Sequence, residues 1–189
     1  MPELNAGSHP DRAQALAVLE SADLIWPASE VNACISRVAA EITARLGERY
    51  PLVLSVMGGA VVFAGQLLPQ LAFPLDLDYV HATRYRNDTQ GRDLAWKVEP
   101  KADIRGRVVL VLDDILDEGH TLAAVRERLL AMGVAEFFCA VLAVKDTGQE
   151  KPIQADFFGL RLPNRYVFGC GMDVRGMWRN LPAIYALKE

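Results

Sequence analysis

The segment from Val108 to Leu122, VVLVLDDILDEGHTL, constrains the fold more than any other part of the sequence. Its first five residues are apolar and largely β-branched, which is typical of a strand buried on both faces of a parallel sheet. A polar loop follows, and then a helical pattern in which apolar residues recur three and four positions apart. A strand, a loop and a helix in this order predict an open α/β sheet, which binds ligands at the carboxyl ends of its strands.

The polar loop carries two kinds of ligand-binding group. Asp113 and Asp114 place carboxylates at the strand end, where they can hold sugar hydroxyls or a hydrated divalent cation. The residues after them open a helix, whose N–H groups and positive dipole end attract phosphate. These are Asp117, Glu118, Gly119, His120, Thr121 and Leu122. A ligand with both a polyol and a phosphate, brought in with magnesium, suits both halves of the loop. A capped helix start with solvated acids is the structural alternative.

Two further apolar runs, 51–56 and 137–144, have the composition of buried strands. The first leads into Met57, Gly58 and Gly59, and glycines directly after a strand permit either a close backbone approach or a tight turn. The second leads to Lys145, which can face a site or extend its charge into solvent. We expect these strand ends to meet the end of 108–112 at one edge of the sheet.

Two shorter strands are predicted at 75–84 and 94–98, on either side of a polar segment that contains glycine. Such a segment suits a lid that closes over a site. Arg84, Tyr85 and Arg86 stand at its start and could supply positive charge.

Composition indicates an ordinary globular protein of one domain. The chain has 189 residues, of which 51% are hydrophobic and 23% charged. A net charge of −4 argues against a nucleic-acid-binding surface, which is expected to be basic. The three cysteines lack CxxC spacing and are interpreted as reduced thiols. The first residues do not resemble a signal peptide, and no apolar run is long enough to cross a bilayer, so we expect a cytoplasmic protein with no membrane partner.

Residues Val111 to Leu122, VLDDILDEGHTL, closely resemble the 5-phosphoribosyl-1-pyrophosphate (PRPP) signature of the type I phosphoribosyltransferases. The resemblance implies that Asp113 and Asp114 hold the ribose hydroxyls of PRPP. It implies that the loop from Asp117 to Leu122 cradles the 5′-phosphate. It also makes the turn of Met57, Gly58 and Gly59 the pyrophosphate loop, and the segment starting at Arg84 and Tyr85 the flexible catalytic loop.

The chain departs from the pattern of this family at three positions. Met57 stands where lysine often precedes the two glycines, so one cation near the pyrophosphate must come from elsewhere. Glu118 adds a negative charge near a phosphate, so its side chain is expected to point away from that phosphate. His120 can still donate a hydrogen bond.

The last part of the chain indicates which members of this family the sequence resembles most. Lys145 and the segments DFFGLRLP, YVFG and WRNL resemble, in order and spacing, the hypoxanthine-guanine phosphoribosyltransferases from about Val53 onward. This implies that Lys145 hydrogen-bonds the 6-oxo group of a purine, that Tyr166 stacks on the base, and that the backbone of Val167 reads its exocyclic edge.

Two more positions take their expected roles from the same resemblance. Asp173 is expected at the purine site, near a second magnesium ion, and Arg179 is expected to reach the pyrophosphate. The expected metal ligands are Asp113, Asp114 and Asp173.

The resemblance implies a Mg²⁺-dependent purine salvage enzyme. It would transfer the 5-phosphoribosyl group from PRPP to hypoxanthine or guanine and yield IMP or GMP plus pyrophosphate. Asp117 is the expected catalytic residue, placed to share the proton of the attacking nitrogen. Two alternatives remain open: a phosphoribosyltransferase for another base, such as xanthine or uracil, and a nucleotide-sensing regulator of the same fold.

The expected architecture is a single domain over residues 1–189. Its mainly parallel central sheet would have four or five strands flanked by helices, and a small hood would come from about residues 1–30 and 150–189. The family implies a homodimer or homotetramer.

Overall fold

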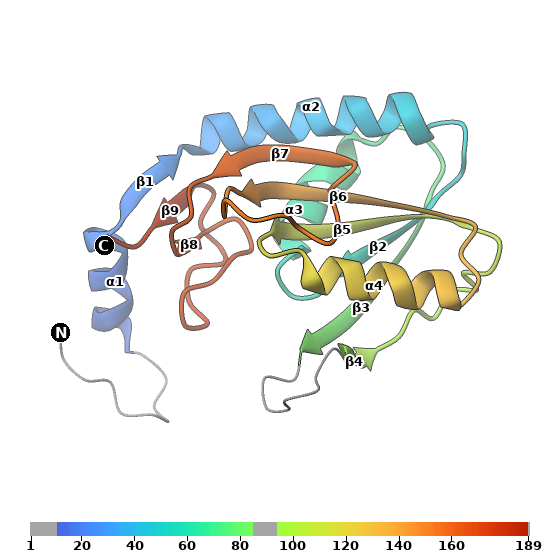
Figure 1. The fold of residues 1–189 in the computed structure, drawn as a ribbon. Helices are drawn as coiled ribbons and strands as arrows, with labels where there is room; N and C mark the ends of the chain where they lie inside the picture. The colour runs from blue at the N-terminus through green and yellow to red at the C-terminus, as the bar shows by residue number, and fades with distance from the viewer. Residues whose placement is uncertain (1–10, 85–93, 189) are drawn as a thin grey trace.

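A six-stranded sheet forms the centre of the computed structural model, which describes residues 11–84 and 94–188 (Figure 1). The strand order is β4-β3-β2-β5-β6-β7. The strands are β2 (Leu52–Val56), β3 (Asp76–Arg84), β4 (Leu94–Val98), β5 (Val108–Leu116), β6 (Glu136–Lys145) and β7 (Phe157–Leu162). All neighbours pair in parallel except β3 and β4, which are antiparallel. The mainly parallel α/β fold is confirmed, but with more strands than the four or five expected.

The additional strand is β7, which pairs in parallel with β6 at the edge of the sheet. Residues 157–162 had been expected in the hood, and that expectation was wrong for this segment. The reason is that Phe157 and Leu160 pack into the same core as α2 (Ala28–Leu46), so burial draws the segment onto the central sheet.

Helices cover both faces of this sheet (Figure 1). α2 and α3 (Val61–Leu67), which continues into the short 3₁₀ helix η1 (Leu68–Gln70), pack on one face. α4 (His120–Ala131) packs on the other. The buried side of α2 shows the helical spacing predicted from the sequence, with Val31, Ile35, Val38, Ile42 and Leu46 all buried.

The central position of β5 explains its continuous apolar sequence. Leu110 and Leu112 belong to the core under α2 and α3, whereas Val109 and Val111 belong to the core under α4. A strand covered on both faces has no solvent-facing position to fill with polar residues. All side chains from Val109 to Leu112 are accordingly buried.

A second, antiparallel sheet lies beside the carboxyl ends of β5, β6 and β7 (Figure 1). Its order is β1-β9-β8, with β1 (Asp23–Trp26), β8 (Val167–Phe168) and β9 (Ile184–Ala186). Helix α1 (Arg12–Ser21) precedes β1 and begins with a capping box formed by Asp11 and Gln14. We call residues 11–26 and 163–188 the hood. The hood thus brings together segments from near the two ends of the described chain.

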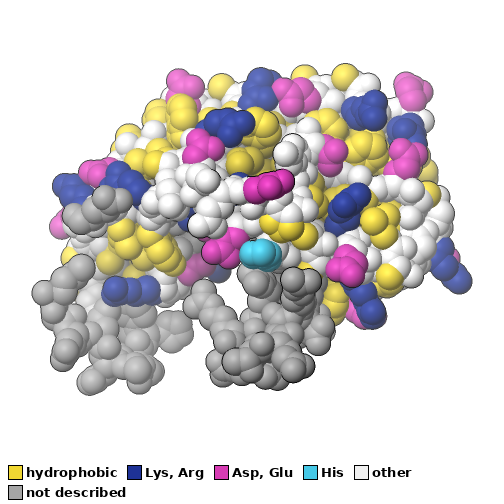
Figure 2. Space-filling model, in the orientation of Figure 1, with side chains coloured by type: hydrophobic (Ala, Val, Ile, Leu, Met, Phe, Trp, Pro, Cys, Tyr) yellow, Lys and Arg dark blue, Asp and Glu magenta, His cyan; other side chains and the backbone are white. Residues whose placement is uncertain are grey.

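The surface of the described residues mixes both signs of charge. In the view of Figure 2, lysine and arginine side chains lie singly or in pairs among aspartate and glutamate. None of the helices within residues 11–84 and 94–188 combines the length and apolar character that a membrane span requires. All three cysteines are free and buried, as expected for reduced thiols.

Candidate functional site

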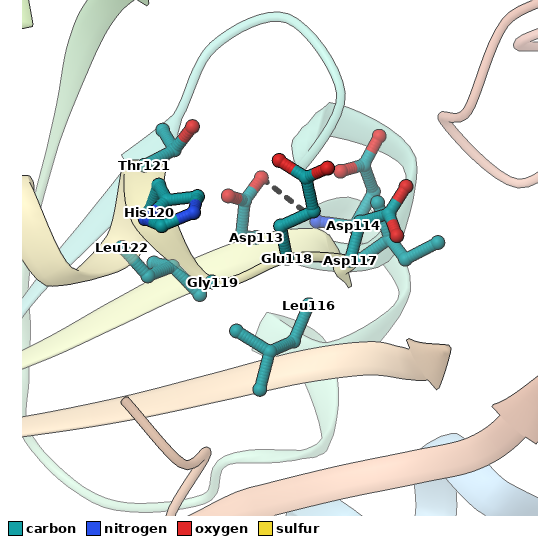
Figure 3. A pocket seen from close by; sticks show the side chains of 10 residues that line it. Asp113, Asp114, Leu116, Asp117, Glu118, Gly119, His120, Thr121 and Leu122 are labelled. Atoms are coloured by element: carbon teal, nitrogen blue, oxygen red, sulfur yellow. Dashed lines mark hydrogen bonds between the residues drawn. The ribbon is translucent and has the colours of Figure 1, made fainter. Parts of the chain in front are cut away.

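The loop between β5 and α4 encloses a pocket of about 380 Å³ (Figure 3). The ten consecutive residues from Asp113 to Leu122 line it. Gly119 occupies the N-cap of α4 with φ of 84°, a conformation that glycine adopts without strain. No side chain among the described residues caps this helix start, so the first-turn N–H groups are available to an anion. We call this cavity the phosphate pocket.

Two buried carboxylates stand at the entrance of this loop. Asp113 and Asp114 are both less than a tenth exposed, and the Asp114 N–H donates to Asp113 Oδ1 at 2.9 Å. Burial raises the pKa of Asp113 well above its ordinary value, and the neighbouring Asp114 carboxylate raises it further. Burial also raises the pKa of Asp114, although the Asp113 hydrogen bond and the charge of Arg179 act in the opposite direction. Such a pair is stabilised by hydroxyl donors or by a cation.

The turn after β2 packs directly on Asp114. A Cβ atom added to Gly59 would lie 2.0 Å from Asp114 Oδ2. A Cβ atom added to Gly171 (φ 103°) would lie 2.0 Å from the Gly59 carbonyl oxygen. Glycine is therefore required at both positions, whereas Gly58 has no atom within 4 Å of such a Cβ. The structure has both features that the sequence left open: residues 57–60 form a turn, and Gly59 within it makes a close backbone approach.

A second cavity, of about 240 Å³, lies beside the first. It is lined by Asp114, Ile115, Asp117, Lys145, Tyr166, Val167, Met172 and Asp173. Lys145 comes from the end of β6, and Tyr166 and Val167 come from the hood. The four residues expected at a purine thus meet in one cavity, although the sequence separates the first and last of them by nearly thirty residues. We call this cavity the base pocket.

Lys145 faces Asp117 across the base pocket. Its Nζ donates to Asp117 Oδ2 at 2.6 Å, and its side chain is only 12% exposed. The alternative in which this lysine extends into solvent is therefore wrong. The ion pair joins the end of β6 to the loop that follows β5.

Arg179 and Asp173 are paired in the same region. Arg179 Nη2 lies 2.5 Å from Asp173 Oδ1, and Nη1 donates to the Gly171 carbonyl at 2.6 Å. The second oxygen of Asp173 accepts from the Gly176 N–H at 2.6 Å. Arg179 is the described cation whose charge reaches Asp114.

The expected metal ligands do not form a closed cluster. Among the residues that the structure describes, no three His, Cys, Asp or Glu side chains have the arrangement of a metal site. Asp114 and Asp173 line the base pocket and Asp113 the phosphate pocket. These carboxylates nevertheless fit magnesium. In enzymes that act on phosphates, one or two carboxylates usually bind the ion together with water and phosphate oxygens.

Some expected site residues are not placed here. Tyr85 and Arg86 lie outside the described residues, and Arg84 is the last residue of β3. Conversely, the sequence did not indicate Ile115 or Met172, which line the base pocket, because isolated apolar residues are interpreted as core. It also did not indicate Lys151, which contacts the backbone of Asp117.

Comparison with known proteins agrees with this arrangement. A family model described as the phosphoribosyl transferase domain matches residues 27–175. The hypoxanthine-guanine-xanthine phosphoribosyltransferase of Tritrichomonas foetus is 32% identical over 88% of this chain and 91% of its own length. The hypoxanthine-guanine phosphoribosyltransferase of Bacillus subtilis is 29% identical over 84% of this chain and 89% of its own.

Solved structures extend the comparison to the fold. A structure of a hypoxanthine-guanine-xanthine phosphoribosyltransferase superposes with a TM-score of 0.81 at 31% identity, and the match covers 90% of this chain and 99% of the other. A hypoxanthine phosphoribosyltransferase from Staphylococcus aureus has a TM-score of 0.85 at 22% identity, which shows a shared fold. The chain therefore belongs to the phosphoribosyltransferase family, a family of transferases, and within it resembles the hypoxanthine-guanine enzymes.

Proposed function

We propose that this protein is a purine salvage enzyme that transfers the 5-phosphoribosyl group from PRPP to hypoxanthine or guanine. The products are IMP or GMP and pyrophosphate. The observation that carries this proposal is the meeting of Lys145, Tyr166 and Asp117 in one cavity beside the acidic end of β5. A base, a sugar and a phosphate could occupy the adjoining pockets as one nucleotide.

The base pocket suits a 6-oxopurine. The Lys145 ammonium has only donors, so it pairs with an oxo group and is a poor partner for the amino group of adenine. The Tyr166 ring is 55% exposed and offers a face on which a purine can stack. Val167 lines the same cavity, and its backbone would read the exocyclic edge of the base.

The PRPP moieties are assigned to the phosphate pocket and its surroundings. Asp113 and Asp114 hold the ribose hydroxyls, and the segment from Asp117 to Leu122 holds the 5′-phosphate. The pyrophosphate lies against the turn of Met57, Gly58 and Gly59 and against Arg179. Magnesium, held by Asp113, Asp114 or Asp173 together with substrate oxygens, supplies charge neutralisation to the leaving pyrophosphate when bound.

The chain's own residues then position and stabilise the reacting groups. The C1′–O bond breaks through a state with oxocarbenium character, as in glycosyl transfer generally. The purine nitrogen attacks from the face where Lys145 and Tyr166 hold the base. Asp117 accepts the proton of that nitrogen, and the nearby Lys145 ammonium stabilises the carboxylate in the orientation it needs. Most of the rate enhancement comes from positioning and charge stabilisation.

We further propose that residues 1–189 form one domain and that the protein is a cytoplasmic homodimer or homotetramer. Sedimentation of the purified protein would determine the number of subunits. The oligomer is an expectation from the family, and the mechanism above uses residues of one chain only.

The experiment that tests the function is turnover of PRPP and magnesium with five bases offered separately. Hypoxanthine and guanine should give nucleotide rapidly, whereas adenine and uracil should remain unreacted. Turnover of uracil alone would keep the PRPP site and overturn the assignment of the base pocket. Binding of PRPP without any turnover would favour a nucleotide-sensing regulator.

Xanthine is a second candidate base, and one observation favours it. A cavity of about 400 Å³ adjoins Lys145 and Tyr166 and is lined also by Asn164, Arg165 and Lys188. Xanthine carries a second oxo group, which these cations could hold. Turnover of xanthine in the same assay, at a rate near that of guanine, would establish this wider range.

A further inference from the structure

A second lysine, Lys151, contacts the loop of the phosphate pocket but does not line the pocket itself. It lies in the connection between β6 and β7, and its Nζ donates to the backbone carbonyl oxygen of Asp117. Thr147 Oγ1 accepts from the same ammonium at 3.4 Å. The Lys151 Cβ would lie 3.4 Å from a Cβ on Gly119, so the lysine stem packs against the turn that starts α4. Lys151 is not among the residues that line the pocket.

Asp117 is therefore held at two points by two lysines of one segment. Lys145 binds its side-chain carboxylate at 2.6 Å, and Lys151 binds its main-chain carbonyl. The first contact faces the base pocket, whereas the second lies outside both pockets. Loss of Lys151 would release the backbone of this residue without removing any group that lines a cavity.

The direction of the Asp117 carbonyl determines the direction of the next N–H group. The peptide between Asp117 and Glu118 is trans, and in a trans peptide the C=O and the N–H point to opposite sides. Lys151, which does not line the pocket, holds this carbonyl and so fixes the orientation of the peptide between Asp117 and Glu118, two residues that do line it. A cation on the carbonyl also polarises the peptide and makes that N–H a stronger donor.

We propose that Lys151 is a positioning residue for the 5′-phosphate of PRPP, acting through the peptide bond between Asp117 and Glu118. This inference rests on the proposed function, because it assigns the phosphate of PRPP to this pocket. Without Lys151 this peptide can rotate, and the loop from Asp117 to Leu122 loses the fixed shape with which it would hold the phosphate. The helix-start N–H groups would remain, so binding is weakened and not abolished.

The test compares Lys151→Met with the wild type. Methionine keeps most of the stem and removes the ammonium. The Kd of PRPP by calorimetry and its KM should both rise about tenfold, the effect expected when one charge-assisted hydrogen bond is lost. The KM of hypoxanthine should change less than about twofold, because Lys151 lies outside the base pocket. Lys151→Arg keeps a cation and should recover most of the affinity.

Lys101→Met is the matched control. Lys101 is an exposed lysine before β5, at the opposite end of that strand, and its loss should leave both KM values unchanged. If Lys151→Met does not fold, Lys151→Gln retains a neutral donor, removes the charge and should show a smaller rise in the Kd of PRPP.

Three outcomes would overturn the inference. One is unchanged PRPP affinity in Lys151→Met. Another is an equal rise in both KM values together with a lower melting temperature, which would make Lys151 a general structural support. The third is failure of Lys151→Arg to recover affinity. Failure of the proposed function is distinguishable, because the wild type would then bind no PRPP in the calorimeter or turn over no base.

Discussion

The phosphate pocket and the base pocket are built in opposite ways. Ten consecutive residues line the phosphate pocket, so a strand, a left-handed glycine and a helix start determine its form. The base pocket takes its lining from the end of β5 and the loop after it, from β6 and from the hood, and it exists only when these segments pack together. Local geometry thus determines the first pocket, and long-range packing determines the second.

This difference predicts how the two pockets respond to change. A substitution in the hood, other than at Asp173 or Arg179, should weaken purine binding and leave PRPP binding intact. Three residues, Asp114, Ile115 and Asp117, line both pockets, and the two acids among them should affect the reaction that joins the pockets.

The largest effect is expected for Asp117→Asn. The amide cannot accept the proton of the attacking nitrogen, so kcat should fall by about 10²–10⁴. PRPP affinity should change little, because the backbone of the loop is retained. Steady-state kinetics and calorimetry with PRPP measure the two quantities. Asp146→Asn, at an exposed acid paired with Arg161, is the control. A PRPP affinity that falls as steeply as kcat would make Asp117 a phosphate-loop residue only.

Lys145→Ala should act on the base pocket alone. Loss of the ammonium should raise the KM of hypoxanthine by about 10- to 100-fold, the range for one hydrogen bond from a charged donor. The preference for oxopurines over adenine should disappear, while the Kd of PRPP should stay within about twofold. Competition assays with both bases measure the preference. A retained preference for oxopurines would exclude Lys145 as the reader of the 6-oxo group. Lys97→Ala, at an exposed residue of β4, is the control.

Asp23→Asn tests whether a hood residue that does not line the base pocket still affects binding of the base. Arg165, next to Tyr166, donates to Asp23 Oδ2 at 2.6 Å and to the Leu187 carbonyl at 2.7 Å. Weakening this ion pair should loosen the segment before β8 from β1 and raise the KM of the base about threefold, in line with about 0.5–1 kcal/mol for a partly exposed pair. PRPP affinity should not change. Glu41→Gln, which breaks the surface pair with Arg37, should alter neither value. Equal effects on base and PRPP would mean that the two pockets are not independent.

Asp113→Asn tests the phosphate pocket through the thermal stability of the protein. Burial raises the pKa of Asp113 above its value in the unfolded chain, so ionisation favours the unfolded state once the pH exceeds that lower value, and a neutral amide avoids this cost. The variant should therefore melt at a higher temperature than the wild type at pH 7. The difference should shrink as the pH falls below about 4, because the carboxyl of Asp113 then becomes protonated in the unfolded wild type as well. Calorimetric melting between about pH 3 and 8 measures it. A difference independent of pH would show that burial is not the cause.

The sequence predicted the locally determined parts of the molecule well. α4 lies where the helical spacing indicated it, and β5 begins with the apolar run. The strand is longer than expected, because it continues through Asp113 and Asp114 to Leu116 before the loop begins. The sequence did not predict β7, because the pattern of residues 157–162 does not state which strand they pair with. It also could not predict Lys151, since a lysine in a connecting loop has no periodic signature and its partner is a carbonyl oxygen thirty-four residues away.

The pairing of β1 with β9 has a consequence for synthesis of the chain. β1 leaves the ribosome early, but its only neighbour in the hood sheet is the last strand described. The strands of the central sheet and the loop that holds the phosphate are all complete before β9 emerges. A nascent chain would thus acquire the part that holds the sugar phosphate first, and the part that selects the base only after β9 has been made.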